Sequence, residues 1–168
     1  MKKIIILIES LFDEQELIYP YHRFREDYEV ELVGSNRDEK YSSKSGVSFK
    51  STLSSAEVNV EDYAGIFIPG GFSPDFMRRC EQTVKLVEEF DKAKKPIAAI
   101  CHGAWMMASA CDIKGKDITS FHSIKDDLEN AGANWVDKEV VVSDHLITGR
   151  TPVDLPAVVK AFIEQIEE

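Results

Sequence analysis

The sequence predicts an α/β fold in which a mostly parallel sheet lies between two layers of helices, forming a three-layer sandwich. Residues 3–8, 65–69 and 96–100 are short apolar runs, which are typical of strands buried on both faces. Segments with the helical spacing of apolar residues separate these runs. Because the 168 residues contain no linker-like stretch, we expect a single domain over residues 1–168.

The first part of the chain is predicted to be a strand, a helix and a second strand. After the strand at residues 3–8, a helix is expected at 13–26, where acidic residues are crowded near the start. Pro20 lies inside this helix, so a kink or local break is expected there. The less regular segments that follow the second strand, at 30–34, are a surface loop at 36–45, a short edge strand at 47–52 and an irregular or briefly helical connection at 56–63.

The second part alternates further strands and helices. Residues 74–94 are expected to form one long amphipathic helix with Cys80 in the core. The strand at 96–100 leads into another helix that starts near Ala104. The remaining predicted elements are strands at 117–121, 135–136, 139–143 and 146–148, a short helix at 123–132 with Ser123 as N-cap, and a C-terminal helix with an apolar stripe from Leu155 to Ile166, capped by Thr151 or Asp154.

Cys101 stands directly after the strand at 96–100 and is followed by His102, Gly103 and a helix. A tight strand-to-helix turn exposes its apex side chain and points the free N–H groups of the helix at the sulfur, which favours thiolate over thiol. The same logic places a serine at the elbow of α/β-hydrolases. From spacing alone, a buried cysteine that acts as a small hydrophobic residue explains Cys101 about as well.

Two other features are expected beside Cys101, because reactive groups gather at the carboxyl ends of parallel strands. Gly70 and Gly71 follow the strand at 65–69 and allow backbone N–H groups to approach a ligand, although an ordinary tight turn explains such a pair alone. Acidic residues from Asp13 onward follow the first strand. The expected meeting of a carboxylate, a backbone donor pair and a cysteine at one edge of the sheet favours the interpretation of Cys101 as a nucleophile.

The composition excludes several classes of function. A net charge of −10, with acids and bases mixed along the chain, argues against a nucleic-acid partner. The apolar run near Met1 is too short to span a membrane and lacks a signal-peptide cleavage pattern. Cys80, Cys101 and Cys111 show no C-x-x-C spacing, which argues against zinc binding and redox exchange, so no metal site is expected. A reducing cytoplasm fits this cysteine usage best.

Five stretches of the sequence carry a family resemblance. They are E-L-I-Y-P-Y-H-R from Glu16, P-G-G from Pro69, A-I-C-H-G from Ala99, I-K-D-D from Ile124 and N-A-G-A-N-W-V-D from Asn130. Together they resemble PfpI-type intracellular proteases of the class I glutamine amidotransferase-like superfamily, which also holds the parkinsonism-associated deglycase. The resemblance extends from Lys3 to near the C-terminus. It implies a flavodoxin-like sheet and homo-oligomers, either dimers or hexamers.

The resemblance also implies roles for individual residues. Cys101 matches the family nucleophile, His102 the histidine that follows it, and the backbone N–H groups of Gly71 and His102 the oxyanion hole. Such donors stabilise the charge that develops when a thiolate attacks a carbonyl, and losing one commonly lowers the rate ~10²-fold or more. The His102 side chain is expected to act as a general acid or base, or to orient its neighbours, since adjacent side chains tend to point apart.

Two acids of the family pattern are shorter in this sequence. The family glutamate beside the nucleophile matches Asp13, so a backbone shift, a bridging water or Glu14 has to cover the missing methylene. The glutamate that a neighbouring subunit lends in PfpI-type hexamers matches Asp75. In the family the glutamate from the neighbouring subunit is thought to complete a catalytic triad with the cysteine and the histidine. Both shorter acids would change the distances within such a site. A family position that can carry tyrosine is Phe121 here, without the hydroxyl.

These residues predict a cysteine-dependent hydrolase without cofactor that acts on a small-molecule or peptide substrate. The reaction class is that of a peptidase or amidase, or of a glyoxalase or deglycase acting on methylglyoxal adducts. The alternative is an oxidative-stress sensor with little turnover, in which Cys101 is oxidised to a sulfinate. The elbow and the donor pair favour the hydrolase, because its reaction needs those parts.

Overall fold

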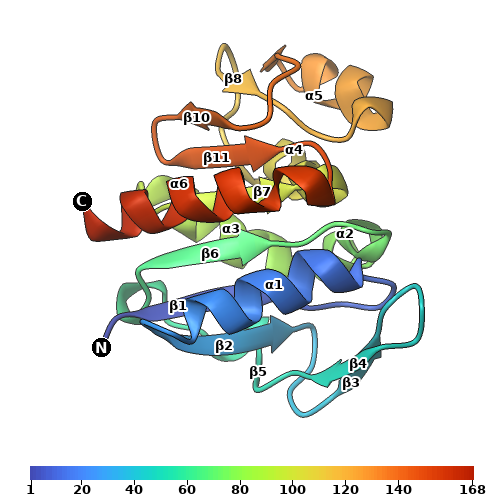
Figure 1. The fold of residues 1–168 in the computed structure, drawn as a ribbon, viewed down its shortest axis with the longest axis vertical. Helices are drawn as coiled ribbons and strands as arrows, with labels where there is room; N and C mark the ends of the chain where they lie inside the picture. Colours follow the sequence, from blue (N-terminus) through green and yellow to red (C-terminus); the bar gives the residue numbers. More distant parts are fainter.

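The computed structural model describes residues 1–168 and contains a seven-stranded sheet with helices on both faces (Figure 1). The strand order is β10-β11-β7-β6-β1-β2-β5, and only β10 runs antiparallel to its neighbour. The strands are β1 Lys3–Leu7, β2 Glu29–Gly34, β5 Leu53–Ser54, β6 Gly65–Ile68, β7 Ile97–Ile100, β10 Val141–Ser143 and β11 Leu146–Gly149. This order confirms the predicted three-layer α/β fold with a mostly parallel, flavodoxin-like sheet.

The helices form a layer on each face of the sheet. They are α1 Glu14–Phe24, α2 Ser73–Arg78, α3 Glu81–Lys92, α4 Ala104–Ala110, α5 Lys125–Asn130 and α6 Leu155–Glu167. In Figure 1, α1 and α6 lie in front of the strands, and α3 and α4 lie behind them. Side chains of β1 alternate between the two cores, so Ile4 and Ile6 pack on the α1 and α6 side and Ile5 and Leu7 on the other.

The structure corrects two helix predictions. The single helix expected at residues 74–94 is two helices, because Cys80 has an extended backbone and forms the N-cap of α3. Cys80 is therefore half-buried at a helix start and is not a core residue. Of the kink or local break expected at Pro20, the break is absent, because α1 continues through this buried residue. A proline at that point removes a single N–H donor, that of Pro20 itself.

Several short segments also differ from prediction. Residues predicted as a loop and an edge strand form a separate hairpin of β3 (Lys40–Ser42) and β4 (Ser48–Lys50), so β5 forms the edge of the main sheet instead. β8 (Asp117–Ile118) and β9 (Asn134–Trp135) pair in parallel outside the main sheet. The helix expected from Ser123 begins with a 3-10 turn, which leaves the Ser123 side chain free to approach another residue instead of capping.

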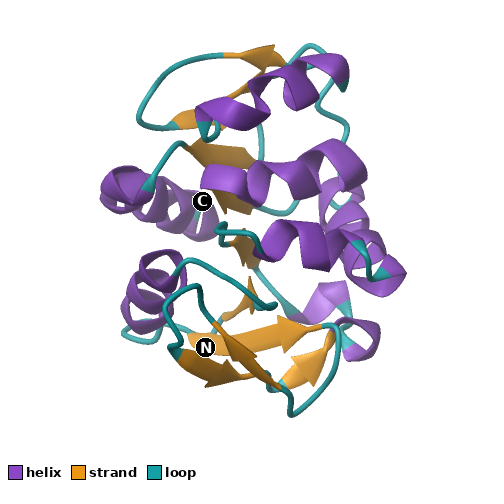
Figure 2. Cartoon of the chain, turned by 90° about the vertical axis from the view of Figure 1, so that its right-hand side faces the viewer, coloured by secondary structure: helices purple, strands orange, loops and turns teal.

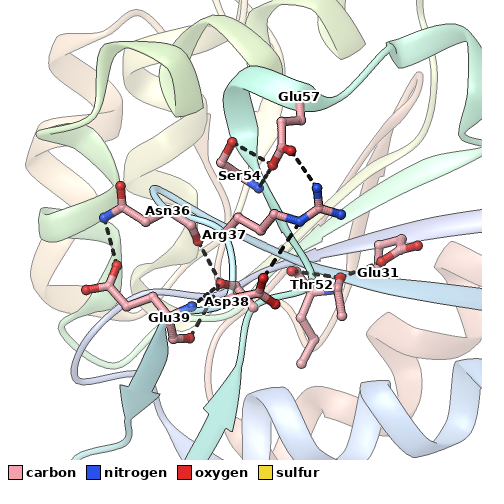
Figure 3. Close-up of polar contacts among 10 residues, drawn as sticks. Glu31, Asn36, Arg37, Asp38, Glu39, Thr52, Ser54 and Glu57 are labelled. Carbon is pink, nitrogen blue, oxygen red and sulfur yellow. Dashed lines mark hydrogen bonds and ion pairs between the residues drawn. The ribbon is translucent and has the colours of Figure 1, made fainter.

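Exposed polar contacts fasten the loop after β2 to the segment around β5 (Figure 3). The backbone N–H and the hydroxyl of Ser54 donate to the Glu57 carboxylate at 2.8 and 2.9 Å, and Arg37 donates to the same group at 2.9 Å. The Thr52 hydroxyl donates to Glu31 of β2. Charged side chains beside an edge strand of only two residues disfavour pairing with another chain at that edge.

The carboxyl ends of the parallel strands meet at the edge of the molecule that faces the viewer in Figure 2. The β3–β4 hairpin is attached to the loop after β1, because Leu11 N–H donates to Ser42 at 2.8 Å and Lys44 N–H donates to Phe12 at 3.1 Å. Gly71, after β6, forms an isolated bridge with Phe12. Two segments that are distant in sequence, the β3–β4 hairpin and the turn after β6, therefore both contact the loop after β1.

Regarding membranes, none of the helices has both the length and the apolar character that a membrane span requires.

Candidate active site

The cysteine elbow is the strand, tight turn and helix that the sequence predicts. Cys101 follows β7 with a φ of 59°, a left-handed value that is uncommon outside glycine, and it starts a 3-10 turn that leads into α4. Strained residues of this kind cluster at functional sites. Gly103 makes the tight turn possible, since a Cβ there would lie 2.5 Å from the carbonyl oxygen of Ile68. The side chain of Cys101 is thus fixed at the carboxyl edge of the sheet.

The carboxyl group with the largest effect on the pKa of Cys101 belongs to Glu16, in the first turn of α1. Glu16 is completely buried, and its Oε1 accepts the N–H of Gly70 at 2.8 Å. Its Oε2 is buried without a hydrogen-bond partner. Cys101 and Glu16 lie close enough for each to influence the pKa of the other. An unpartnered buried oxygen is unfavourable unless it is protonated and donates to an acceptor, and the sulfur is such an acceptor.

Asp13, which the sequence predicted as this carboxyl group, has a different position. Its Oδ1 accepts the backbone N–H groups of Gln15 and Glu16 at 3.0 and 3.3 Å, so Asp13 is the N-cap of α1. Its Oδ2 pairs with Lys44 at 3.1 Å. The matching of Asp13 to the family glutamate was therefore wrong, and with it the inference of a missing methylene. Glu14 is not the carboxyl group beside the Cys101 sulfur either, because it accepts a hydrogen bond from the Ser45 hydroxyl.

Helix geometry is the signal that identifies Glu16. A cap at Asp13 directs the side chains three and four positions later toward the same face, and Glu16, Leu17 and Pro20 are all buried there. The sequence shows both the N-cap type and this spacing. Asp13 is the N-cap and precedes the buried face, whereas Glu16 lies on it.

The His102 side chain turns toward the nucleophile, although a sequence neighbour was expected to be able to point away. Its Nδ1 lies 3.4 Å from the Cys101 sulfur, and its Nε2 lies 3.3 Å from the Ser123 hydroxyl. The ring also packs against Trp105 and Phe121. Burial lowers the pKa of His102, and the charge of Lys44 lowers it further. A neutral imidazole held in this way can exchange a proton with the sulfur or with a bound substrate.

The two backbone groups predicted as oxyanion donors flank the elbow. The N–H of His102 lies against the sulfur and lowers the pKa of the thiol. Gly71 has a left-handed φ of 71°, and a Cβ on it would lie 2.5 Å from the backbone nitrogen of Asp13. Glycine is thus required where this loop crosses the loop after β1. Gly71, His102 and Cys101 all line one cavity.

This cavity, of about 390 Å³, opens above Cys101. It is lined by Asp13, Glu16, Lys44, Gly71, Phe72, Cys101, His102, Phe121, Thr151 and Pro152. Lys44, which the sequence did not single out, supplies the one lysine or arginine of this set. A second cavity of about 380 Å³ shares Pro152 with the first and is mostly apolar. The site therefore has room for a small carbonyl compound with an attached group.

Asp75 lies outside this cavity. Its carboxylate accepts two hydrogen bonds from Arg79 on the exposed surface of α2, at 2.6 and 3.0 Å. Within one chain Asp75 therefore does not reach Cys101. Cys111 is also remote, and burial raises the pKa of its thiol. No group of three or more His, Cys, Asp or Glu side chains is arranged to hold a metal ion.

Glu16 and Cys101 form a coupled pair. Burial, with a contribution from the charge of Asp13, raises the pKa of Glu16 to about 8, so this carboxyl group keeps its proton at neutral pH. Burial and a charged Glu16 both raise the pKa of the Cys101 thiol, and they outweigh the His102 N–H, which lowers it. The net shift is therefore opposite to the one that the sequence predicts from the N–H groups of the helix. A protonated Glu16 removes the effect of its own charge and offers an O–H donor. The pair can thus hold its proton on Glu16 while the sulfur is ionised.

The fold and the site define a class of α/β proteins with a cysteine at a strand-to-helix elbow, backbone donors around it and a protonated carboxyl group beside it. The DJ-1/PfpI family model matches residues 2–165, and the chain belongs to this family. Deglycase PfpI of Pyrococcus furiosus is 36% identical over 98% of this chain and 99% of its own. A Bacillus subtilis protein that carries the name of a candidate cysteine protease is 39% identical over 93% of both chains.

A solved structure supports the same assignment. A protein of Anabaena variabilis with a DJ-1/ThiJ/PfpI-like and a ferritin-like domain superposes with a TM-score of 0.97 and is 36% identical. The alignment covers 99% of this chain and 48% of the two-domain protein. Membership in this family is consistent with a cysteine hydrolase or deglycase, and names of relatives indicate an enzyme.

Proposed function

We propose that this protein is a cysteine-dependent hydrolase that acts on carbonyl adducts of the deglycase type. The observation that carries the proposal is the position of the Cys101 sulfur, at the left-handed elbow between the buried Glu16 carboxyl group and the His102 imidazole, 3.4 Å from Nδ1. The relatives named as deglycases support the choice of substrate class.

The proposed reaction begins at the carbinol carbon that carries the amine or thiol of the methylglyoxal adduct. His102 takes the carbinol O–H proton, the aldehyde C=O re-forms, and the C–N or C–S bond breaks as Glu16 gives the leaving group a proton. The Cys101 thiolate then attacks the aldehyde carbon: an S–C bond forms, and the electron pair of the C=O bond moves to oxygen, where the N–H groups of Gly71 and His102 stabilise the charge. The oxyanion is protonated, and the C–H proton of this carbon moves through an enediol to the neighbouring ketone carbon, so this carbon becomes a thioester carbonyl and the ketone becomes a hydroxyl without an outside oxidant. Water attacks the resulting acyl-enzyme thioester and releases Cys101 with an acid product.

The test uses methylglyoxal adducts of N-acetylcysteine that are freed of excess methylglyoxal before assay. We expect wild type to release N-acetylcysteine and an acid product, and Cys101→Ser to lose this activity at least ~10³-fold. A fluorogenic aminomethylcoumarin peptide tests amide hydrolysis in parallel. If wild type turns over neither compound, the hydrolase proposal fails.

A second candidate function is an oxidant sensor, and the specific observation that favours it is the unpartnered Oε2 of Glu16 beside the sulfur. Two equivalents of peroxide convert a thiolate to a sulfinate, and each peroxide is reduced to water or hydroxide. A protonated carboxyl group and the His102 N–H are suitable donors to sulfinate oxygens. Intact mass and peptide mapping after mild peroxide test this function, which is excluded if Cys101 gains oxygen no faster than Cys80.

Asp75 retains a role in the proposal through a neighbouring subunit. Its exposed position on α2 makes it accessible to another copy of the chain, and the family resemblance implies homo-oligomers. Light scattering after size-exclusion chromatography gives the oligomeric state. A monomer that hydrolyses the adduct would exclude an Asp75 supplied in trans, and an oligomer in which Asp75→Asn keeps full activity would exclude it as well.

A further inference from the structure

Lys44 reaches the cavity from an element that contributes no other residue to it. The β3–β4 hairpin lies outside the main sheet, and Lys44 follows β3 in the connection between the two strands. Its backbone N–H donates to Phe12 at 3.1 Å, and the neighbouring Ser45 hydroxyl donates to Glu14 at 2.7 Å. The hairpin thus holds Lys44 beside the loop that carries Asp13.

The Lys44 ammonium group is anchored and still available. Its Nζ lies 3.1 Å from Oδ2 of Asp13, while half of the side chain remains exposed. The other oxygen of Asp13 accepts two N–H groups at the start of α1, where the helix dipole stabilises a negative charge. An ammonium group has three N–H donors, and Asp13 is the one partner found for it, so two donors remain for a ligand.

Other cations near the site do not have this freedom. Arg150, in a neighbouring cavity, donates to both oxygens of Asp154 and to Asp137. His102 is kept neutral by a lowered pKa. The chain as a whole carries a net charge of −10, so its general field repels anions. Lys44 is therefore the lysine or arginine of the cavity lining that can give the site a preference for an anion.

We propose that Lys44 gives the Cys101 site a preference for substrates that carry a carboxylate within a few bonds of the reacting carbonyl carbon. This inference rests on the proposed function and adds a substrate class to it. The carboxylate binds the free donors of Lys44 while the carbonyl oxygen binds the N–H groups of Gly71 and His102. These contacts at two places orient the carbonyl carbon toward the sulfur.

The first test does not depend on catalytic turnover. Iodoacetate and iodoacetamide both alkylate the Cys101 thiolate with loss of iodide, and they differ mainly in the carboxylate. We expect the ratio of their rate constants at Cys101, measured by peptide mapping, to fall about fivefold or more in Lys44→Gln. Lys44→Arg is expected to keep the ratio near that of wild type. The preference of wild type is also expected to weaken at high salt.

Lys40→Gln is the matched control, because Lys40 lies on the same hairpin and is exposed but does not line the cavity. It should leave the ratio unchanged. An unchanged ratio in Lys44→Gln, or an equal fall in Lys40→Gln, overturns the inference. Circular dichroism shows whether each variant is folded, and Lys44→Arg separates loss of charge from a general disturbance of the hairpin.

The second test compares kcat/KM for the methylglyoxal adducts of N-acetylcysteine and N-acetylcysteine amide. Wild type should favour the carboxylate, and Lys44→Gln should lose that preference. Turnover of both adducts at equal efficiency contradicts the inference but leaves the proposed function intact. No turnover of either adduct contradicts the proposed function, and the alkylation ratio then still decides whether Lys44 favours anions at Cys101.

Discussion

Asp13, Glu14 and Glu16 lie within four residues of one another at the start of α1, and their positions there separate their roles. Asp13 caps the helix, Glu14 binds Ser45 at the surface, and Glu16 turns inward to Cys101. The difference arises from the rotation of about 100° per residue along a helix, which places one of the three side chains against the sheet. Only Glu16 is fully buried, and burial is what lets a carboxyl group keep its proton at neutral pH.

Replacement of these acids should therefore have unequal effects on activity. Glu16→Gln preserves an acceptor for Gly70 N–H but removes the acidic proton, and we expect kcat/KM to fall about 10²-fold or more. Asp13→Asn keeps an N-capping oxygen and should cost less than about 10-fold. Steady-state kinetics on the adduct of N-acetylcysteine measures both, with Glu14→Gln as control. A larger fall in kcat/KM for Asp13→Asn than for Glu16→Gln would show that Asp13, and not Glu16, is the catalytic acid.

The raised pKa of Glu16 also makes stability depend on pH. The folded protein keeps this proton up to about pH 8, whereas the unfolded chain loses it near 4.5. Unfolding between these values releases a proton, so the free energy of unfolding contributed by Glu16 decreases by about 1.4 kcal/mol per pH unit as the pH rises through this window. Glu16→Gln lacks this effect.

Urea denaturation at pH 5, 7 and 9 measures this dependence. We expect Glu16→Gln to gain stability relative to wild type from pH 5 to 7, and to change little beyond the folded pKa. A difference that stays constant from pH 5 to 9 would show that Glu16 has an ordinary pKa in the folded protein.

At the scale of elements, the site depends on the close crossing of two turns. Gly70 after β6 faces the elbow after β7, and a Cβ on Gly70 would lie 2.7 Å from Glu16 Oε1 and 2.9 Å from the backbone nitrogen of His102. Parallel pairing of β6 with β7 sets this distance, because Ile68 lies opposite Ala99. In the proposed reaction the two turns carry the donor groups and the nucleophile, so their separation sets the geometry of that reaction.

Gly70→Ala should therefore separate the two turns and impair catalysis. We expect at least a ~10²-fold fall in kcat/KM, because a displacement of about 1 Å is enough for such a loss. Gly115→Ala is the matched control: nothing lies within 4 Å of its Cβ position, and its left-handed φ of 74° affects a turn remote from the site. This control should lose about 1 kcal/mol of stability but keep its activity. Equal activity in the two variants would show that the close approach of the two turns is not needed for catalysis.

At the scale of the whole molecule, the buried strands and the elbow were predictable because their signals are local. Residues 97–100 are all apolar, and Cys101 follows them directly. The hairpin of β3 and β4 was missed because three-residue strands give too short an alternation to recognise. At the helix break the Cys80 sulfur lies 3.9 Å from the Ser55 hydroxyl, and Lys44 contacts Asp13, so both contacts join residues distant in sequence. Tertiary contacts thus decided the parts of the site that the sequence left open.

A buried hydrogen-bonded pair, His145 and Asp91, lies at the end of the strands opposite to Cys101. His145 precedes β11, and its Nε2 lies 2.7 Å from Oδ1 of Asp91 near the end of α3. The other oxygen of Asp91 accepts the N–H of Asp112 after α4 at 2.9 Å. The His145 carbonyl accepts the N–H of Ile97, at the start of the strand that ends at Cys101. One carboxylate therefore connects two helices and the sheet.

Loss of this connection should reduce stability without changing the chemistry. Asp91→Ala leaves a buried imidazole and a buried N–H without their acceptor, and we expect the free energy of unfolding to fall by about 3 kcal/mol. Because Cys101 lies at the other end of β7, kcat/KM per folded molecule should remain within about twofold of wild type. Urea denaturation and kinetics well below the melting temperature measure the two effects, with the exposed Asp144→Ala as control. A large fall in kcat/KM of folded Asp91→Ala would instead show that strain at the amino ends of β7 and β11 is transmitted along the strands to the nucleophile.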